Sequence, residues 1–428
     1  MDCDISGIMP DQMGENIMDN QHCRFCGREL KHTFADLGLS PLANEYLRED
    51  GLSRGQIFYP LRVQVCKHCL LAQAALYQQP ENIFGEYQYF SSYSASWLAH
   101  CRAYVDMIIP RLKLTERSQV LEVACNDGYL LQYFQPYGIP VRGVEPAENV
   151  AAEARRKGID VRCCFFGRES AGEIAAEDGK YDLVIGNNVL AHVPDINSFV
   201  AGLAAVLKPE GTITMEFPHL MQLMKNCQFD TIYHEHFYYL SLTAVQRIFR
   251  AHELEIYDVE TLETHGGSLR IYAAHQAWGS AHTEPSVTEL LEQEQSAGLC
   301  EMQTYTQFSG KMLHIKLDTL RMLSEIKQKG GHIAAFGAAA KGNTFLNYCG
   351  IKRDMIDFVV DSNPHKQGLY LPGSLIPILE PEALRRYRPD YLVILPWNLT
   401  DEIMEKAAFV REWGCRFITC VPDLKILR

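Results

Sequence analysis

Short apolar runs separated by longer amphipathic stretches recur through the middle of the chain. The runs fall at residues 119–124, 141–145, 181–188 and 211–216. Apolar residues at helical spacing predict a helix over 96–112, and another helix is expected to begin at 129–134. This alternation predicts a doubly wound parallel sheet, with a ligand at the carboxyl ends of its strands.

The same alternation returns in the last third of the chain. Residues 289–328 are rich in Glu, Gln, Lys and Leu and predict a largely helical stretch. Four more apolar runs follow, at 332–337, 355–361, 391–395 and 416–420. A second Rossmann-like α/β domain with a parallel sheet is therefore expected to close the chain.

The N-terminal part has no such alternation but carries two CxxC pairs. Cys23 and Cys26 form one pair and Cys66 and Cys69 the other, with 39 residues (27–65) between them. Four thiolates make a closed tetrahedral zinc site, which is structural because no coordination position stays open. A redox CxxC, the alternative, normally follows a strand, opens a helix and needs no second pair. Within the intervening segment, residues 36–47 predict a loop.

The turn after the first central strand is typical of S-adenosylmethionine sites. Small residues let the backbone approach the ligand, and Glu145, at the end of the second strand, is placed to accept both ribose hydroxyls. An NAD-binding unit is the alternative, but no G-x-G-x-x-G stands at this turn. The residues expected at the cofactor are Glu122, Ala124, Asn126, Asp127, Gly128, Glu145, Phe166, Asn187 and Asn188.

A second small-residue turn, at 337–343, follows the first strand of the C-terminal domain. The backbone amides of residues 338–343, with Lys341 beside them, predict a cradle for an anion such as pyrophosphate. Asp361 comes 24 residues after Gly337, roughly where a dinucleotide fold keeps its ribose acid. NAD is therefore an open alternative for this half.

In the sequence, a run of ionisable side chains, Tyr233-His-Glu-His236, lies between the segments that predict the two sheets. A histidine exchanges protons near neutral pH, a tyrosine hydroxyl can stabilise an oxyanion, and a glutamate can orient an imidazole. In an extended segment His234 and His236 share a face, so periodicity does not separate them. The alternative interpretation is a set of ordinary polar residues beside the start of a strand or helix.

Length, charge and cysteine content restrict the class of protein. The 428 residues suggest two or three domains, and a net charge of −13 argues against nucleic-acid binding. No run of 18 apolar residues predicts a membrane span, and the first 20 residues lack the features of a signal peptide. Fourteen cysteines without a secretion signal indicate a reducing, cytoplasmic setting. We expect a monomer with four segments: a disordered leader (1–20), a zinc-binding domain (21–80), a methyltransferase domain (81–262) and a C-terminal nucleotide-sugar-binding domain (263–428).

Taken together, these motifs resemble the nucleotide-sugar C-methyltransferases, the C-3′-methylating enzymes of deoxysugar biosynthesis. The resemblance runs from Cys23 to about Leu424 and rests on the paired CxxC motifs and on segments 122–130, 233–236, 265–270 and 337–343. The departure from the family pattern is the pair Ala124-Cys125, because a small Gly or Ala together with Ser is more usual at these two positions. It implies a dTDP-linked or similar NDP-linked 4-keto sugar as substrate, S-adenosylmethionine as methyl donor and a structural zinc ion.

The resemblance also assigns roles to residues. His236 matches the general base, and the pocket is implied to contain Tyr87, His192, Tyr233 and Glu235. Residues expected at the substrate are Tyr89, Arg270, Ala339, Lys341, Asn343 and Asp361. The expected reaction is removal of the C3′ proton to give an enolate, followed by in-line attack on the sulfonium methyl group. The alternatives are a sugar O- or N-methyltransferase and a zinc-scaffolded binding module without catalysis.

Overall fold

The computed structural model describes residues 19–77 and 91–427. The chain divides into two compact units, each assembled from three stretches of sequence. Unit 1 consists of Met1–Leu30, Cys66–His219 and Phe237–Cys300, and unit 2 of Lys31–Val65, Leu220–His236 and Glu301–Arg428. The segment boundaries at residues 20, 80 and 262 stay predictions.

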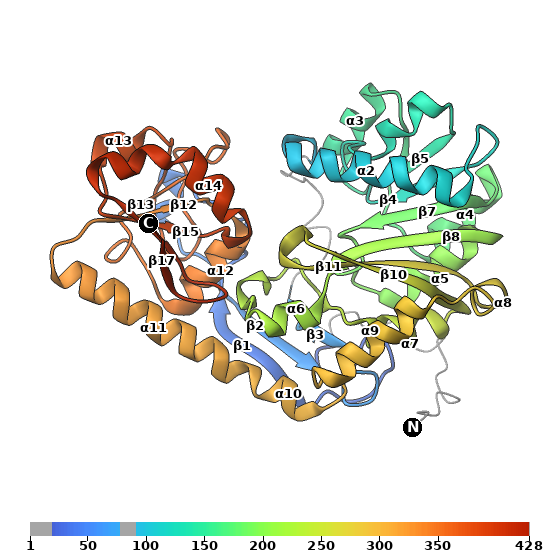
Figure 1. The fold of residues 1–428 in the computed structure, drawn as a ribbon, viewed down its shortest axis with the longest axis horizontal. Coiled ribbons are helices and arrows are strands. Elements are labelled where there is room, and N and C mark those ends of the chain that lie inside the picture. The colour runs from blue at the N-terminus through green and yellow to red at the C-terminus, as the bar shows by residue number, and fades with distance from the viewer. Residues whose placement is uncertain (1–18, 78–90, 428) are drawn as a thin grey trace. The chain divides into compact units, whose positions relative to one another are not determined.

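Unit 1 contains the predicted methyltransferase sheet, extended at one edge. Its seven strands have the order β10-β11-β8-β7-β4-β5-β6 (Figure 1). The strands β8, β7, β4, β5 and β6 are parallel to one another. The strand β11 is antiparallel to both of its neighbours, β8 and β10. Their bounds are β4 Val120–Val123, β5 Val141–Val144, β6 Asp160–Arg162, β7 Tyr181–Asn187, β8 Leu207–Pro218, β10 Leu254–Leu262 and β11 Ser268–His275.

The antiparallel hairpin β10–β11 was not anticipated from the sequence. Its acidic positions are matched by arginines elsewhere in the unit: Arg111 pairs with Asp258 and Glu260, and Arg250 pairs with Glu255. The alternation of apolar and polar residues in Leu254–Leu262 is a local strand pattern, which the sequence analysis did not use.

Helices cover both faces of this sheet (Figure 1). On one face lie α2 (Ala95–Leu112), which Ser94 caps by accepting a hydrogen bond from the Trp97 N–H, and α3 (Glu148–Arg156). The other face carries α4 (Arg168–Asp178) and α5 (Ile196–Val206). Further along the chain come α7 (Leu242–Arg250), α8 (Gln276–Gly279) and α9 (Pro285–Ser296).

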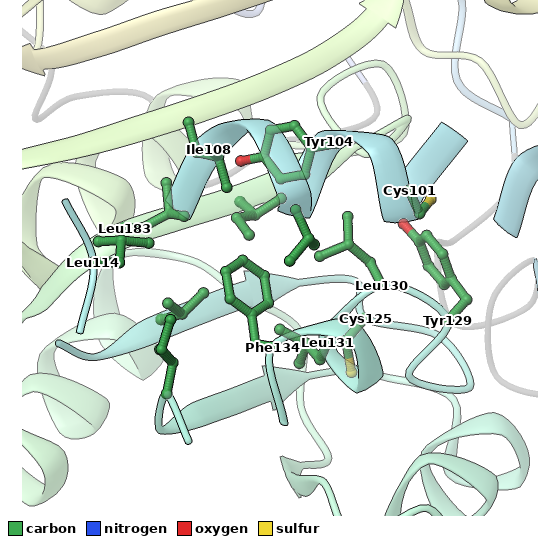
Figure 2. Close-up of a cluster of buried hydrophobic side chains, with 14 of the residues drawn as sticks. Cys101, Tyr104, Ile108, Leu114, Cys125, Tyr129, Leu130, Leu131, Phe134 and Leu183 are labelled. Carbon is green, nitrogen blue, oxygen red and sulfur yellow. The ribbon is translucent and has the colours of Figure 1, made fainter. Parts of the chain in front are cut away.

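The core beneath α2 explains why the expected helix at 129–134 does not form. Leu131 and Phe134 point into a cluster with Tyr104 and Ile108 of α2 (Figure 2). Two short 3₁₀ turns, η4 (Leu131–Tyr133) and η5 (Gln135–Tyr137), bring these apolar side chains inward. The segment is thus helical in character but ends before an α-helix is established.

Unit 2 contains the predicted second parallel sheet, in the order β14-β13-β12-β15-β16-β17, with only β17 antiparallel. Its strands are β12 Ile333–Phe336, β13 Phe358–Val360, β14 Ile378–Leu379, β15 Tyr391–Ile394, β16 Arg416–Thr419 and β17 Lys425–Leu427. The strand order reverses between β12 and β15, and ligands bind at such a switch point in open α/β sheets.

The expected helical stretch 289–328 ends in the long helix α11 (Phe308–Gln328), preceded by α10 (Met302–Thr306). Beyond it, α12 (Ala340–Cys349) follows β12, and Lys316 of α11 donates to the Tyr348 carbonyl of α12. The remaining helices of the sheet domain are α13 (Ala383–Tyr387), η8 (Trp397–Leu399), α14 (Thr400–Lys406) and η9 (Ala408–Trp413).

Unit 2 also includes two stretches from earlier in the chain. One is the antiparallel pair β1 (His32–Ser40) and β2 (Tyr59–Val65), joined through the short 3₁₀ helix η2 (Glu49–Ser53). The other carries α6 (Leu220–Lys225) and η6 (Phe229–Thr231). The prediction of a loop from residue 36 is wrong as far as Ser40, because β1 continues through that stretch, in which Leu37 and Ser40 are buried.

One buried carboxylate in unit 1 joins three elements. Glu294 of α9 is 0% exposed, and it accepts hydrogen bonds from His219 (2.7 Å) and from the N–H groups of Leu242 and Thr243 (2.6 and 2.8 Å). It therefore caps the first turn of α7. Burial alone would raise the pKa of Glu294, but these donors hold it below its ordinary value.

We predict that Glu294→Gln destabilises unit 1 by about 3–5 kcal/mol, because an amide cannot accept from all of these donors and leaves His219 without its partner. A carboxylate with a lowered pKa contributes stability above its unfolded-state pKa of about 4.3, and this stability is lost as the pH falls through the folded-state value. Denaturant unfolding should therefore separate variant and wild type clearly at pH 7, and the difference should shrink as the pH falls below about 4. Glu292→Gln, on the exposed face of the same helix, is the matched control; equal midpoints for the two variants would contradict the prediction.

Candidate active site and metal centre

The two CxxC motifs fold into matching knuckles within unit 1. The Gly27 N–H donates to the Cys23 carbonyl (2.8 Å), and the Leu70 N–H donates to the Cys66 carbonyl (2.9 Å). The residue after each pair takes a positive φ, 68° at Gly27 and 64° at Leu70. A glycine adopts this conformation without strain, whereas Leu70 is held there by the fold.

The knuckles bring four sulfur donors together. The Sγ atoms of Cys23, Cys26, Cys66 and Cys69 all lie within 4.8 Å of one another. Neighbouring sulfurs are 3.5–3.6 Å apart, and a tetrahedral zinc with bonds of about 2.3 Å spaces its sulfurs about 3.8 Å apart. The set therefore fits the predicted structural zinc ion.

The knuckles are anchored to the methyltransferase part of unit 1. Arg24 donates to the carbonyls of Ala74 (2.8 Å) and Phe237 (3.0 Å) and to the Tyr238 hydroxyl (3.2 Å). Asn197 of α5 donates to the carbonyls of Arg24 and Phe25. These contacts surround the short antiparallel pair β3 (Ala72–Ala74) and β9 (Tyr238–Tyr239).

The predicted cofactor turn after β4 is held by the predicted ribose acid. Glu145 accepts one hydrogen bond from the Asn126 N–H and one from the Ala147 N–H, both 3.0 Å long. A carboxylate offers about four acceptor positions, so two remain for ribose hydroxyls. The unusual Cys125 is accommodated because residue 143 is glycine: a Cβ there would lie 2.4 Å from the Cys125 Sγ.

Several buried polar atoms at the carboxyl ends of β4 and β7 have no protein hydrogen-bond partner within the described residues. They are both carboxylate oxygens of Glu122, Oδ1 of Asp127, Nδ2 of Asn187 and Oδ1 of Asn188. Burial raises the pKa of Glu122, and the nearby Tyr129 hydroxyl offsets this only in part. Because unpaired buried polar groups are costly, such a cluster fits a ligand with amino, carboxylate and hydroxyl groups. The amino-acid and ribose parts of S-adenosylmethionine provide these groups.

Two other predicted residues of this half occupy less informative positions. The Phe166 ring packs edge-to-face on Phe199 of α5, with ring centroids 5.5 Å apart. His192 lies in the turn after β7, where its N–H donates to the Val189 carbonyl. Their contacts with adenine and with the sugar stay predictions.

The run Tyr233–His236 belongs to unit 2, and its two histidines have different surroundings. Nδ1 of His236 lies 2.8 Å from the Thr231 carbonyl. A carbonyl only accepts, so Nδ1 carries the proton and the neutral ring has its lone pair on Nε2. The Tyr233 ring packs on the imidazole with centroids 4.0 Å apart. His236 is therefore held in the tautomer that a base requires.

His234 is instead enclosed by protein. It is 7% exposed, its Nε2 lies 3.3 Å from the Pro60 carbonyl, and the Tyr59 ring packs against it. Burial lowers its pKa and keeps the imidazole neutral. The structure thus distinguishes the two histidines, which the sequence pattern did not.

Glu235 is held by a residue that the sequence analysis missed. The Asn44 Nδ2 donates to the Glu235 Oε1 over 2.6 Å, and burial raises the pKa of Glu235. Asn44 lies in the segment after β1 that the sequence predicted only as a loop. No local signal connects two positions 191 residues apart.

The predicted anion cradle of unit 2 is a tight turn between β12 and α12. Gly337 has φ 92°, and a Cβ there would lie 2.5 Å from Pro396. The Ala338 N–H donates to the Asp361 carboxylate (2.7 Å), and the Asn343 N–H is bonded to the Ala339 carbonyl within the helix. Of the amides of 338–343 that were predicted to bind an anion, the first and the last already have protein acceptors. Fewer N–H groups are therefore available to an anion than the sequence predicted.

Lys341 lies at the helix start with its ammonium 4.7 Å from the Trp397 ring centroid, donating to Asn398 (2.7 Å). Burial lowers its pKa and the nearby Asp230 raises it in part. Asp230 in turn accepts from the Trp397 indole N–H (2.7 Å). The lysine is thus placed beside the turn, as the sequence predicted.

Three predicted substrate residues are engaged by the protein itself. Both oxygens of Asp361 accept backbone N–H groups, from Ala338 and Asn363. Asn343, 1% exposed, donates to the Ala43 carbonyl, and Arg270, 4% exposed, pairs with Glu216 and Glu260. Substrate contacts by these residues and by Ala339 stay predictions, and Tyr87 and Tyr89 lie outside the described residues.

Comparison with known proteins assigns this arrangement to a family. Three family profiles match in order: a zinc binding domain (residues 23–84), a methyltransferase domain (97–259) and a C-methyltransferase C-terminal domain (263–422). C-methyltransferase NovU of Streptomyces niveus is 36% identical over 405 residues, which cover 95% of this chain and 96% of NovU.

The chain belongs to this family of C-methyltransferases. It is an S-adenosylmethionine-dependent enzyme whose cysteine cluster is its zinc site.

Other likenesses to the methyltransferase are local. A ubiquinone biosynthesis O-methyltransferase of Bradyrhizobium sp. (strain ORS 278) is 33% identical over 103 residues, 23% of this chain and 38% of that protein. The PH0226 protein from Pyrococcus horikoshii OT3 has a TM-score of 0.37 at 18% identity, covering 46% of this chain and 99% of its own. In the part of the methyltransferase that the structure describes, no helix has both the length and the apolar character needed to cross a membrane.

The environment of Glu145 predicts a pH-dependent affinity for the methyl donor. Burial raises the pKa of Glu145 to about 7, against the lowering effect of the two N–H donors. Only the carboxylate accepts from both ribose hydroxyls, so affinity for S-adenosylmethionine should rise about tenfold between pH 6 and pH 8. Isothermal titration calorimetry across this range provides the measurement. Glu145→Gln should bind more weakly and keep only the dependence that comes from the ligand's own amino group; an unchanged affinity would contradict the assignment.

Proposed function

We propose that this C-methyltransferase methylates C-3′ of a nucleotide-linked 4-keto-deoxysugar, with dTDP the expected carrier, and that His236 is the general base. The observation that carries the proposal is the hydrogen bond between the His236 Nδ1 and the Thr231 carbonyl (2.8 Å). It keeps the lone pair on Nε2 and sets the ring orientation.

The chemistry of the acceptor explains why a base is needed. A carbon attached to a ketone-bearing carbon loses a proton to give an enolate, whereas a hydroxyl or amine acceptor needs no ketone. We propose that the His236 Nε2 takes the C3′ proton while Tyr233 and His192 donate to the ketone oxygen, where negative charge develops. S-adenosylmethionine supplies the activated methyl group, and the enolate carbon forms the new bond.

The cradle of unit 2 supports a nucleotide diphosphate as the handle of the substrate. The start of α12 presents backbone N–H groups, and Lys341 adds a positive charge beside them. Both Asp361 oxygens accept a backbone N–H, as those of Glu145 do, so acceptor positions also remain there and NAD stays the alternative ligand of this half. The proposal includes a cytoplasmic location for the enzyme, where nucleotide sugars are made.

His236→Asn is expected to abolish exchange of the sugar's C3′ proton with solvent, even when S-adenosylmethionine is replaced by its demethylated product. Tyr233→Phe should lose about 10²–10³-fold, the usual effect of removing one oxyanion donor. Exchange into deuterated buffer, followed by NMR on a panel of dTDP-4-keto sugars, measures both.

His234→Asn is the matched control for this experiment. This variant removes an equivalent imidazole two residues away. We expect it to retain proton exchange but to be less stable than wild type, because the contact of His234 with the Pro60 carbonyl is lost. If His234→Asn stopped the exchange and His236→Asn did not, the base would have been assigned to the wrong histidine.

Lys341→Met should weaken binding of dTDP by about 10–100-fold, because a buried charge-assisted contact to phosphate is lost, and should leave S-adenosylmethionine affinity unchanged. Calorimetric titration with each ligand separates the two effects. Lys352→Met removes an exposed lysine elsewhere in unit 2 and serves as the control. Equal dTDP affinities in the two variants would mean that the diphosphate binds elsewhere.

A further inference from the structure

A four-residue loop, Ala43–Tyr46, contacts both the anion cradle and the catalytic run inside unit 2. At one end, the Ala43 carbonyl accepts from the Asn343 Nδ2 of α12 over 2.8 Å. At the other, the Tyr46 hydroxyl donates to the Ala338 carbonyl in the cradle turn over 2.6 Å. Between these anchors Asn44 donates to Glu235 over 2.6 Å. The loop is thus fixed on the cradle at two points and holds Glu235 at a third.

The cradle end of the loop is itself rigid. Lys366 donates a second hydrogen bond to the Ala338 carbonyl (2.8 Å) and lies over the Tyr46 ring, 5.1 Å from its centroid. The N–H of the same residue, Ala338, is held by Asp361 (2.7 Å). The N–H and the carbonyl of Ala338 are thus both hydrogen-bonded, so the residue to which Tyr46 binds is itself held in place beside the proposed diphosphate site.

Between the two anchors, Asn44 of the loop binds a buried carboxylate, that of Glu235. Glu235 is 9% exposed, and Asn44 places an N–H donor on its Oε1. Such a donor favours the ionised form of the carboxyl, against the burial that raises its pKa. It also fixes the direction in which the carboxylate points, next to His236 in the chain.

We propose that Asn44 is a positioning residue for Glu235, and that the loop Ala43–Tyr46 links the nucleotide cradle to the catalytic run. This inference rests on the proposed function for its catalytic consequence. Asn44 need not touch the reacting atoms: it acts by keeping Glu235 oriented and ionised. The contacts that fix the loop on the turn proposed to bind the nucleotide are thus the contacts that place the Asn44 donor at Glu235.

The test compares two variants of Asn44 in the proton-exchange assay across pH. Asn44→Ala should lower kcat about tenfold at pH 7 with KM within about twofold, and the acidic limb of the pH profile should move to higher pH, because the carboxyl has lost the donor that favours ionisation. The rate of Asn44→Ala should recover towards wild type at high pH. Asn44→Asp should shift the limb further, since two neighbouring carboxyls share a proton.

Two controls separate positioning from general damage. Tyr46→Phe removes the contact with the cradle, so KM should rise without a shift of the pH limb. Asn226→Ala removes an amide contact with Gln222 in the same unit and should behave as wild type. A kcat loss in Asn44→Ala that persists unchanged at high pH would overturn the proposal.

A second measurement needs no substrate. Carbon-13 NMR of glutamate-labelled protein follows the titration of the Glu235 carboxyl, assigned by its absence in Glu235→Gln. We expect the midpoint to move to higher pH in Asn44→Ala, and an unchanged midpoint would overturn the inference even if no keto sugar were turned over. Failure of the wild-type enzyme to exchange or methylate any sugar, with the midpoint shifted as expected, would instead contradict the proposed function alone.

Discussion

The buried guanidinium of Arg24 is the contact through which the metal centre influences the rest of unit 1. Its neighbours Cys23 and Cys26 are zinc ligands, so the metal fixes the backbone that carries it. The side chain donates to the carbonyls of Ala74 and Phe237. Nε and Nη2 of the buried guanidinium have acceptors, whereas Nη1 has none among the described residues. Phe237 directly follows His236, so the metal also fixes the chain immediately after the proposed base.

Several buried polar groups lie where the ligands are expected to bind. Glu122 and Asp127 keep unpartnered oxygens at the end of β4, and burial raises the pKa of Glu145 and of Glu235. Such groups reduce the stability of the ligand-free protein, and they are preorganised for partners that the cofactor and substrate supply. By contrast, the equally buried Glu294 has its donors within the fold and stabilises it.

Much of the fold and part of the site could be predicted because their signals are local. Two CxxC pairs, a strand–turn–strand ending in Glu145, and a lysine beside a small-residue turn each lie within a short window of sequence. Three contacts join positions 191 to 300 residues apart: Asn44–Glu235, Arg24–Phe237 and Asn343–Ala43. They depend on tertiary structure, and no periodicity reports them.

The same limit applies to the two histidines and to the charges of the hairpin. His234 and His236 have the same chemistry in the sequence, and they differ in their surroundings: His234 is buried beside the Pro60 carbonyl, whereas His236 faces the Thr231 carbonyl. The strands β10 and β11 carry charges that pair both across the hairpin, as Glu260 does with Arg270, and with other elements, as Asp258 does with Arg111. Where a residue's environment is built by distant segments, the sequence pattern predicts the residue type and leaves its role open.

The interrupted course of unit 2 has a consequence for engineering. Its sheet comes from Glu301–Arg428, but the loop with Asn44 and the run with His236 come from Lys31–Val65 and Leu220–His236. A chimera that exchanges only the C-terminal third for that of a relative would pair a foreign cradle with the native loop and base. The contacts of Asn343 with Ala43, and of Trp397 with Asp230, would then join residues that were not selected together. On the proposed function, transplanting a sugar preference requires the exchange of all three segments, since a C-terminal graft alone would favour a protein that binds a new nucleotide sugar without processing it.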